Sequence, residues 1–525
     1  MSTFPVHTPS DSGFGGAKGF LVDAATSPGS VSTTISGALS AITAKGLVGP
    51  MTVFVAAGSY AESFTLPAGC ALIGLGEVNI TGTVTLTSSA TLLSILDNLR
   101  ITAAAGGTAV SADFGGAGTT STVILRNVAL TASTGGIGLL GAAATFRLEG
   151  YTRISCSVAT GISLVSGDVI ATEVTRLIGE TVHFTGDQVT NTLITSTGGA
   201  SGGVGVEIST LIQDFTGTSI GVNTNATGTI DTTTIFRNGV NVDNMIVTGR
   251  DGANRFFLST DATSVNWIGR VSGTIVADTI LAHTAGVTSI GLIDFPDDGV
   301  TRTTFRVVSM VAGTVTIDGA ELWGGTIPLF SCTTGSGTLV VQNMHVRGFE
   351  HASGTVFSAV DFAGFVEFDS FSVTSQATST LYSITNLGDA AICNMHLFRG
   401  QILHTGAAAT IELAGGGLVI EDLFIRHTSA AAFHSIWIQA GTAANTFEWR
   451  GVNMLDHAEG ALSVAALRVS PGGGGTTVTE NGILEFQSCA ITKQFNIPTG
   501  SATLVNLRGP VPIALISRAS PVSTA

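Results

Sequence analysis

The sequence predicts an all-β fold in which the chain winds into a parallel β-helix, a solenoid of stacked coils. The first observation is composition: of 525 residues, 68 are glycine, 44% are hydrophobic and only 11% are charged, whereas ordinary domains are about 25% charged. The second is a six-residue pattern of apolar, any, turn-forming, apolar, any and apolar residues that recurs along the chain. Strand-forming repeats of roughly 20–30 residues are typical of solenoids.

The third position of the pattern is predicted to be a bend. Apolar residues at the first, fourth and sixth positions cannot share one face of a straight strand, because successive side chains alternate between faces. A residue in the left-handed conformation at position three turns all three inward, and Asn, Asp and Gly tolerate that conformation best. The predicted bend residues, whose stacked Asn side chains we expect to hydrogen-bond one another, are Asn98, Asn127, Gly319, Asn343, Ser370, Asn394, Asp422, Gly451 and Ser488.

The fourth positions are predicted to form one inward stack of apolar side chains. Its members are Leu99, Val128, Met344, Phe371, Met395, Leu423 and Val452. The second and fifth positions should point outward, among them Cys393 and His396 of the "ICNMHL" copy of the pattern.

The start of the chain is predicted to be an arm followed by one helix. Residues 1–30 contain no repeat, and we expect them to form an N-terminal arm. A helix is predicted near residues 32–45, with Ser32 or Thr33 as its N-cap, and we expect it to cap the first coil. Four apolar residues fall on one face of this helix: Ile35, Ala38, Leu39 and Ile42.

The coils are predicted to begin directly after the helix. Two short apolar runs bounded by Gly and Pro, Val53–Ala57 and Ala71–Leu75, indicate buried strands. The repeat then gives a β-helix domain over 31–505, although its register is not defined by the pattern between 150 and 310. Residues 506–525 lie outside the repeat and are expected to form a C-terminal arm.

A known superfamily shares these features. The predicted helix, the stretch "VFVAAGSYAESFTLPAGCALIGLG" and the ladder of Asn bends resemble the pectin-lyase-like right-handed parallel β-helix superfamily. That superfamily includes pectate lyases, polygalacturonases, pectin methylesterases and many phage tailspike and fibre proteins. The resemblance implies a right-handed solenoid, closest in character to the viral tailspike, fibre and decoration β-helices.

Composition argues against several classes of function. The net charge is −15 and no basic stripe is present, so we expect no nucleic-acid partner. The five cysteines form no CxxC pair, which favours neither a zinc site nor a disulfide framework. No apolar run approaches 18 residues, so we expect no membrane insertion. The N-terminus lacks the layout of a signal peptide, and we expect no cofactor and no metal.

The motifs of the superfamily's enzymes are largely missing. "GSYAE" (Gly58–Glu62) resembles a stretch near the start of pectin methylesterases, but their catalytic signatures are absent from the sequence, so we interpret it as a turn between strands. The acidic stretch "DFPDDG" (Asp294–Gly299) is interpreted as an ordinary turn rather than a cation site. "LDHAEG" (Leu455–Gly460) is interpreted as a solvated loop.

If the chain is an enzyme, its catalytic residues are expected among the outward second positions. Asp369 and Glu421 would lie on alternate coils, about 9–10 Å apart, at the upper edge of the spacing of about 6.5–9.5 Å that inverting glycosidases use. One would act as general acid and the other as base of a polysaccharide hydrolase or lyase. We expect instead that no residue is catalytic and that this surface is passive.

The leading functional hypothesis is a non-enzymatic virion structural protein, a spike, fibre or capsid-decorating β-helix that contacts host surface glycans. The low charge predicts extensive apolar flanks, which usually mark association surfaces, so we expect a homotrimer bound to other virion proteins through its N-terminal arm. Without a signal peptide, such a protein would be made in a host cytoplasm and assembled into virions. The alternatives are a tailspike-type polysaccharide depolymerase and a bacterial surface adhesin.

Overall fold

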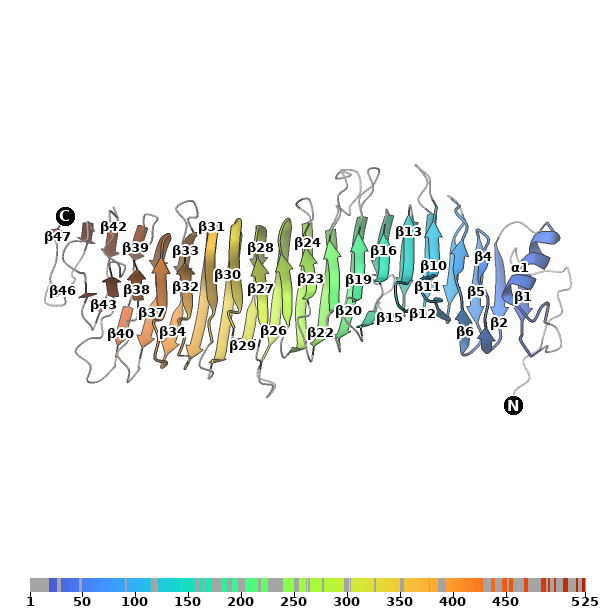
Figure 1. The fold of residues 1–525 in the computed structure, drawn as a ribbon, viewed down its shortest axis with the longest axis horizontal. Coiled ribbons are helices and arrows are strands. Elements are labelled where there is room, and N and C mark those ends of the chain that lie inside the picture. The colour runs from blue at the N-terminus through green and yellow to red at the C-terminus, as the bar shows by residue number, and fades with distance from the viewer. Residues whose placement is uncertain are drawn as a thin grey trace. The chain divides into compact units, whose positions relative to one another are not determined.

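The computed structural model describes residues 18–524 with gaps, the longest of which are 172–180, 225–238, 457–466 and 471–482. For residues after 437, and for most residues between 157 and 240, the structure describes the backbone only. The chain forms two compact units, Met1–Gly269 and Arg270–Ala525. In each unit the strands succeed one another as stacked coils (Figure 1), and every strand pairing described with its register is parallel, for example β2 with β5. The fold is therefore a parallel β-solenoid.

The N-terminal unit holds the helix α1 (Ile35–Ala44). Its strands are β1 (Lys18–Val22), β2 (Met51–Val55), β3 (Gly58–Tyr60), β4 (Phe64–Leu66), β5 (Cys70–Gly74), β6 (Val78–Thr81), β7 (Val84–Leu86), β8 (Ser94–Asp97), β9 (Arg100–Thr102), β10 (Thr108–Asp113), β11 (Ser121–Arg126), β12 (Ala129–Ala132), β13 (Ile137–Ala142), β14 (Ala144–Glu149), β15 (Tyr151–Cys156), β16 (Thr160–Leu164), β17 (Gly167–Ala171), β18 (Thr181–Gly186), β19 (Asn191–Ser196), β20 (Val204–Phe215), β21 (Ser219–Thr224), β22 (Gly239–Gly249) and β23 (Arg255–Ser259). Strand β24 (Val265–Ile275) contains the residue at which the units divide.

The C-terminal unit consists of strands and their connections in the residues that are described. They are β25 (Thr279–His283), β26 (Val287–Phe295), β27 (Arg306–Met310), β28 (Gly313–Ile317), β29 (Ala320–Trp323), β30 (Phe330–Phe349), β31 (Phe357–Ser375), β32 (Tyr382–Thr385), β33 (Cys393–Phe398), β34 (Gln401–His404), β35 (Ile411–Ala414), β36 (Gly417–Glu421), β37 (Phe424–His427), β38 (Ile436–Gln439), β39 (Thr446–Arg450), β40 (Asn453–Asp456), β41 (Leu467–Ser470), β42 (Ile483–Gln487), β43 (Ala490–Ile491), β44 (Phe495–Asn496), β45 (Leu504–Arg508), β46 (Ile516–Ser517) and β47 (Val522–Thr524).

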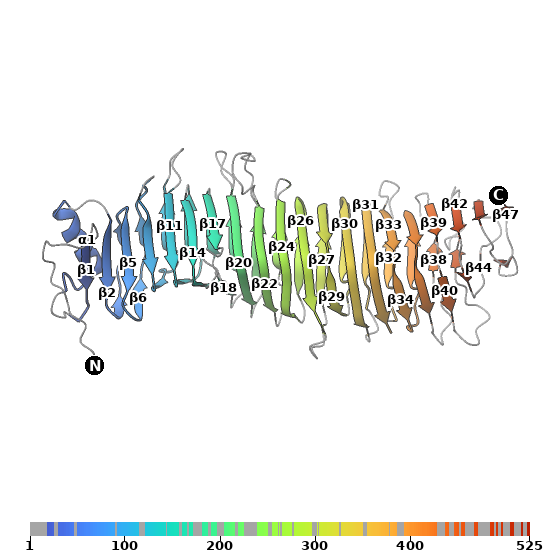
Figure 2. The ribbon, with the colours of Figure 1, turned by 180° about the vertical axis from the view of Figure 1, so that it is seen from behind.

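Each coil contributes strands to separate parallel faces. In the N-terminal unit one face runs β2, β5, β8, β11 and β14, and a second runs β3, β6, β9, β12 and β15. In the C-terminal unit β31 is followed by β33, β36, β39 and β42 on one face, and Figure 2 shows several of these strands in succession. The coil-to-coil order means that outward side chains form columns along a face.

The core of each unit is a set of inward ladders. Strict alternation of buried and less buried residues along β2 and β5 brings apolar side chains into the interior. One ladder of the N-terminal unit, in register across five coils, is Val53, Leu72, Leu96, Leu125 and Leu148, each at most 2% exposed. The corresponding ladder of the C-terminal unit is Ile317, Val341, Phe368, Leu397 and Ile420, all fully buried.

The bends are made largely as predicted. The left-handed residues of the repeat, with φ between 49° and 56°, are Asn98, Asn127, Asn343, Ser370, Arg399 and Asp422. The Asn side chains bond the backbone of the adjacent coil rather than one another: Asn98 Nδ2 donates to the carbonyl of Gly74 at 2.9 Å, and Asn343 Nδ2 to that of Asp318 at 3.0 Å. Gly319 lies in register with Asn343 but not in the left-handed region. Gly451 and Ser488 lie outside the described residues.

The predicted bend at Asn394 is wrong, because the bend of that coil is Arg399. Asn394 is an exposed residue within β33, where Cys393, Met395 and Leu397 point inward by simple alternation. The prediction that Cys393 points outward is therefore also wrong. Met344 and Met395 are both fully buried, as predicted, but Met395 is in register with Leu418.

The fourth-position stack therefore takes Gly400 in place of Met395, between Phe371 and Leu423. A Cβ atom on Gly400 would lie 2.4 Å from the Phe371 ring and 2.8 Å from Leu423. Val452, the last predicted member, lies outside the described residues. The stack is otherwise buried, with no described member above 3% exposed.

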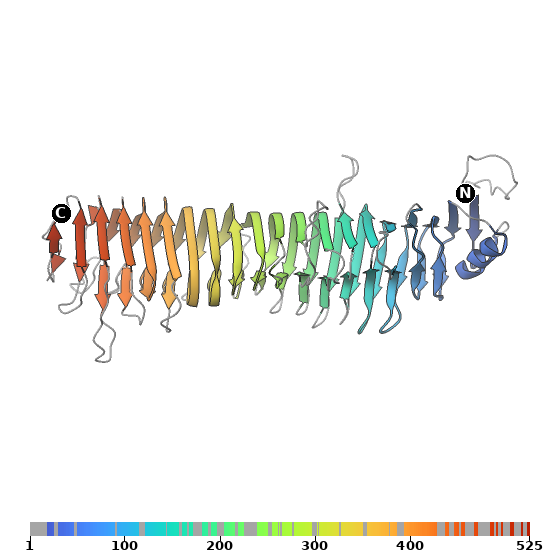
Figure 3. The ribbon, with the colours of Figure 1, turned by 90° about the horizontal axis from the view of Figure 1, so that it is seen from above.

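Helix α1 lies against β1 and β4 at the N-terminal end of its unit (Figure 3). Its predicted apolar face is confirmed, since Ile35, Ala38, Leu39 and Ile42 are buried. The predicted N-cap is wrong by one or two residues: Thr34 is the cap, and its hydroxyl accepts a hydrogen bond from the amide of Gly37 at 3.1 Å. Ser32 supports the cap instead, accepting from the amide of Thr34.

Strands also occur in the segments expected to be arms. In the segment 1–30, β1 pairs in parallel with all of β2, so this part of the expected N-terminal arm continues the solenoid; residues 1–17 lie outside the described chain. In the segment 506–525, β47 pairs with β45. In β1 the side chains of Phe20 and Val22 are buried and that of Leu21 is less so, the alternation of a coil strand.

Candidate functional site

The two predicted candidate carboxylates lie on one outward column of the C-terminal unit. Asp369 of β31 is in register with Phe398 of β33, which is in register with Glu421 at the end of β36. The backbone positions of the two residues are therefore separated by two strand spacings, about 9–10 Å, as predicted. Sequence reasoning missed Phe398, whose place between them follows only from the corrected bend at Arg399.

Asp369 is held by Arg399. Arg399 Nε donates to Asp369 Oδ1 at 2.8 Å, its terminal nitrogen Nη2 bonds Oδ2, and Ser370 Oγ donates to Oδ1 at 3.2 Å. The Asp369 side chain is only 12% exposed, against 64% for Arg399. The hydrogen bond from Arg399 lowers the pKa of Asp369, against the opposing effect of burial. Asp369 therefore stays charged at neutral pH and cannot serve as a general acid there.

A second carboxylate, Glu367, lies beside Asp369 on the same face. It precedes Asp369 by two residues on β31 and is in register with His396. Burial, and then the charge of Asp369, raises the pKa of Glu367, whereas Arg399 lowers it. The sequence analysis did not select Glu367, although the acid–apolar–acid spacing "EFD" signals two carboxylates on one strand face.

Aromatic rings cover the same face. The ring of His396 lies 4.6 Å from that of Phe365 on the neighbouring strand and 5.3 Å from that of Phe398, centroid to centroid. Both contacts are edge-to-face, at 79° and 74°, an arrangement that aromatic pairs prefer. All three side chains are half-buried. We call Phe365, His396 and Phe398 the aromatic patch.

The N-terminal unit carries a charge ladder in its own outward column, at the positions that follow its inward ladder. Asp97, Arg126 and Glu149 are in register on β8, β11 and β14. Arg126 bonds Glu149 at 2.6 Å and lies 3.5 Å from Asp97. The hydrogen bond to Glu149 raises the pKa of Arg126. Outward carboxylates in this column thus neutralise a cation on the adjacent coil, which is what Asp369 does with Arg399.

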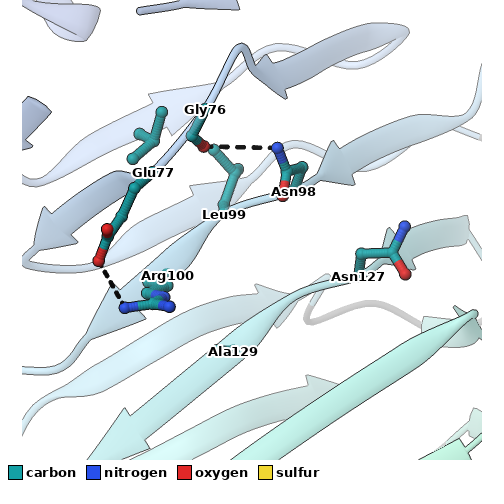
Figure 4. Close-up of a pocket in the computed structure, with 8 residues that line it drawn as sticks. Gly76, Glu77, Asn98, Leu99, Arg100, Asn127 and Ala129 are labelled. Atoms are coloured by element: carbon teal, nitrogen blue, oxygen red, sulfur yellow. Dashed lines mark hydrogen bonds and ion pairs between the residues drawn. The ribbon is translucent and has the colours of Figure 1, made fainter. Parts of the chain in front are cut away.

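An open pocket of about 440 Å³ lies beside this ladder (Figure 4). Glu77 and Arg100 pair across it at 2.6 Å, and Asn98 reaches the carbonyl of Gly76 at 3.4 Å. Both charged side chains are 62% exposed, so the pair contributes little to stability. Asn127, which also lines the pocket, accepts a hydrogen bond from the amide of Tyr151, so the pocket is formed by the bends of neighbouring coils.

The "GSYAE" motif joins the helix to the solenoid. Its first three residues form β3 rather than a turn. Glu62 accepts hydrogen bonds from the amides of Ile35 at 2.7 Å and Ser36 at 2.9 Å, and from the Ser36 hydroxyl at 2.5 Å. The Tyr60 hydroxyl donates to the carbonyl of Ala56 at 2.9 Å. A carboxylate at a helix N-terminus is stabilising, so the Glu of the motif anchors α1.

The described part of the chain contains neither a cluster of metal ligands nor a membrane-spanning helix. No group of three or more His, Cys, Asp or Glu there is placed to hold a metal ion, and no helix there has the length and hydropathy needed to span a membrane. Asp294 of the "DFPDDG" stretch pairs with Arg270. Residues 297–299 of that stretch and 457–460 of "LDHAEG" lie outside the described residues.

Comparison with known proteins finds no matching family model, no matching curated protein and no matching solved structure.

Proposed function

We propose that this chain is a non-enzymatic virion structural protein: a spike, fibre or capsid-decorating β-helix of the pectin-lyase-like, right-handed type that contacts host surface glycans. The observation that carries the proposal is that outward carboxylates form ion pairs with arginines of adjacent coils. Asp369 is bonded to Arg399, as Glu149 is to Arg126, so these acids are neutralised by cations of adjacent coils. A solenoid whose outward acids are already paired with arginines suits display and attachment better than proton transfer.

The working form we propose is a homotrimer held to other virion proteins by the N-terminal segment. The low charge and several large apolar side chains that are about half exposed in the N-terminal unit support association: Leu75, Leu93, Tyr151 and Trp267. Exposed apolar groups of this size favour burial against copies of the same chain, and cyclic symmetry closes the assembly.

Light scattering and particle labelling test this proposal. The purified chain should have three times the 53.1 kDa mass of one copy, and antibodies to it should decorate purified virus particles. A monomer at micromolar concentration would refute the trimer. Labelling of a bacterial envelope instead of particles would favour the surface-adhesin alternative.

A tailspike-type polysaccharide depolymerase is the second candidate, favoured by one observation. Glu367 and Asp369 are neighbours on one face, and their pKa values are moved in opposite directions, an arrangement that assigns an acid and a base in many hydrolases. In this alternative Glu367 donates the proton, and Asp369 or Glu421 acts as base. Incubation with host capsule or lipopolysaccharide should release no reducing ends or unsaturated product if the first proposal holds. Release that is abolished in Glu367→Gln or Asp369→Asn would establish the depolymerase.

A further inference from the structure

We propose that the aromatic patch of β31 and β33, bordered by Asp369, Arg399 and Glu421, is the glycan-binding site, and that it selects uncharged glycans. This inference rests on the glycan contact in the proposed function and assigns that contact a place and a chemistry. The patch lies on the outward face of the C-terminal unit, where its rings come from two neighbouring coils.

The rings provide an apolar platform. His396 is held edge-to-face between Phe365 and Phe398, and this packing fixes ring positions that would otherwise lose conformational freedom on binding. All three rings remain half-buried rather than covered. The C–H face of a pyranose ring is apolar, and its burial against an aromatic surface is favourable in water.

The border of the platform supplies oriented polar groups. Arg399 has five N–H donors in a fixed fork, and its bonds to Asp369 use only part of them while holding the guanidinium in place. Glu421 follows Phe398 in the same column and presents a carboxylate. Sugar hydroxyl groups both donate and accept hydrogen bonds, so donors on one side and an acceptor on the other suit them.

The backbone of Arg399 is itself unusual. Its φ is 49°, a conformation that a long side chain rarely adopts, and other coils place Asn, Ser or Asp there. Strained residues of this kind occur where the surrounding structure fixes them, commonly at binding sites. Here the bend directs the guanidinium toward Asp369, beside the rings.

Charge determines which glycans fit. Four acids lie around Arg399: Glu367, Asp369, Glu421 and Asp422. Arg450 of β39 is in register with Glu421 on the next coil, so acids outnumber cations at this face. The whole chain carries −15. Uronate, sialylated or sulfated polymers would meet repulsion at this face, whereas uncharged hexose polymers would not.

Affinity electrophoresis of the purified full chain tests the inference. The gels would contain uncharged polysaccharides (a glucan, a mannan and a galactan) or an acidic uronate polymer. The wild type should be retarded by at least one uncharged polymer, with little dependence on salt, and not by the uronate. Phe398→Ala and Phe398→Leu should each weaken retardation about tenfold, the loss expected from one aromatic contact. Phe424→Ala, a half-buried outward Phe of β37, is the matched control and should change it less than twofold.

The outcomes separate the inference from the function on which it rests. Retardation by uncharged polymers that survives in Phe398→Ala would overturn the site but leave glycan contact standing. Retardation by the uronate alone would overturn the selectivity. Wild-type protein that is not retarded by any polymer would overturn both the site and the proposed glycan contact. Thermal melts of each variant identify a loss of folding, and Phe398→Leu keeps the apolar volume if the alanine variant unfolds.

Discussion

At the scale of single residues, the bend column shows how local chemistry is matched to backbone conformation. Asn98, Asn127 and Asn343 combine tolerance of positive φ with an amide that bonds the backbone of an adjacent coil. Arg399 has no such short amide, and it occupies the same conformation while bonded to Asp369. The residue type at a bend is therefore set partly by what the side chain reaches.

Asn343→Val and Asn394→Val test the assignment of the bends with one substitution at two positions. The first places a β-branched residue at φ 49° and removes the bond to Asp318, so it should lower the free energy of unfolding by about 1–3 kcal/mol. The second lies on an exposed strand position and should change it by less than about 0.5 kcal/mol. Urea denaturation measures both, and equal losses would contradict the assignment.

At the scale of elements, most of the fold could be predicted from the sequence, but the register between 150 and 310 and the bend of one later coil could not. The helix face and the inward ladders follow from apolar spacing, and the Asn bends follow from the turn-forming residue between the apolar positions. The "ICNMHL" stretch imitates the repeat because an exposed Asn lies inside an ordinary alternating strand. The actual bend lies in "FRG" and lacks the usual Asn. Arg399 occupies the bend and is paired with Asp369, and the Phe371 ring packs against Gly400. Both compensations come from a neighbouring coil, so no local pattern reveals them, and the aromatic patch was missed with them.

Gly400→Ala should destabilise the C-terminal unit by about 1–3 kcal/mol through overpacking against Phe371 and Leu423. The double variant with Phe371→Leu should recover part of that loss, because the smaller side chain leaves room for the added methyl group. Thermal and urea denaturation of the single and double variants measure the coupling. Purely additive effects would show that Gly400 does not belong to the stack.

The anchoring of α1 gives a second prediction at this scale. Glu62→Ala removes the acceptor for the amides of Ile35 and Ser36 and should cost about 1–3 kcal/mol. Hydrogen exchange at those two amides should accelerate selectively. Glu77→Ala, which removes only an exposed ion pair, is the control and should leave exchange in α1 unchanged.

At the scale of the whole molecule, buried histidines make stability depend on pH. The rings of His404 and His427 lie 4.7 Å apart, centroid to centroid, and are tilted by 43° in the interior of the C-terminal unit. Burial, and then the charge of His427, lowers the pKa of His404 from 6.5 to about 4. Burial likewise lowers the pKa of His283 to about 4. Both residues are neutral in the folded protein at pH values where the unfolded chain binds a proton.

The free energy of unfolding should therefore be constant above about pH 6.5 with respect to these groups and fall as the pH drops from 6.5 toward 4. His404→Phe should reduce the fall by roughly 1–3 kcal/mol. His345→Gln, at a side chain that is 44% exposed, should leave the slope unchanged. Urea denaturation at a series of pH values measures both variants, and a slope unaltered by His404→Phe would contradict the assignment.

The parallel pairing of each coil with its neighbours has a consequence for how such a chain changes in evolution. A closed barrel has a strand number set by its circumference, whereas a coil here needs only a matching register above and below, as β33 has with β31 and β36. Duplication or deletion of one complete repeat would leave every remaining interface intact. The number of coils is thus open to selection independently of the surface chemistry that any one coil displays.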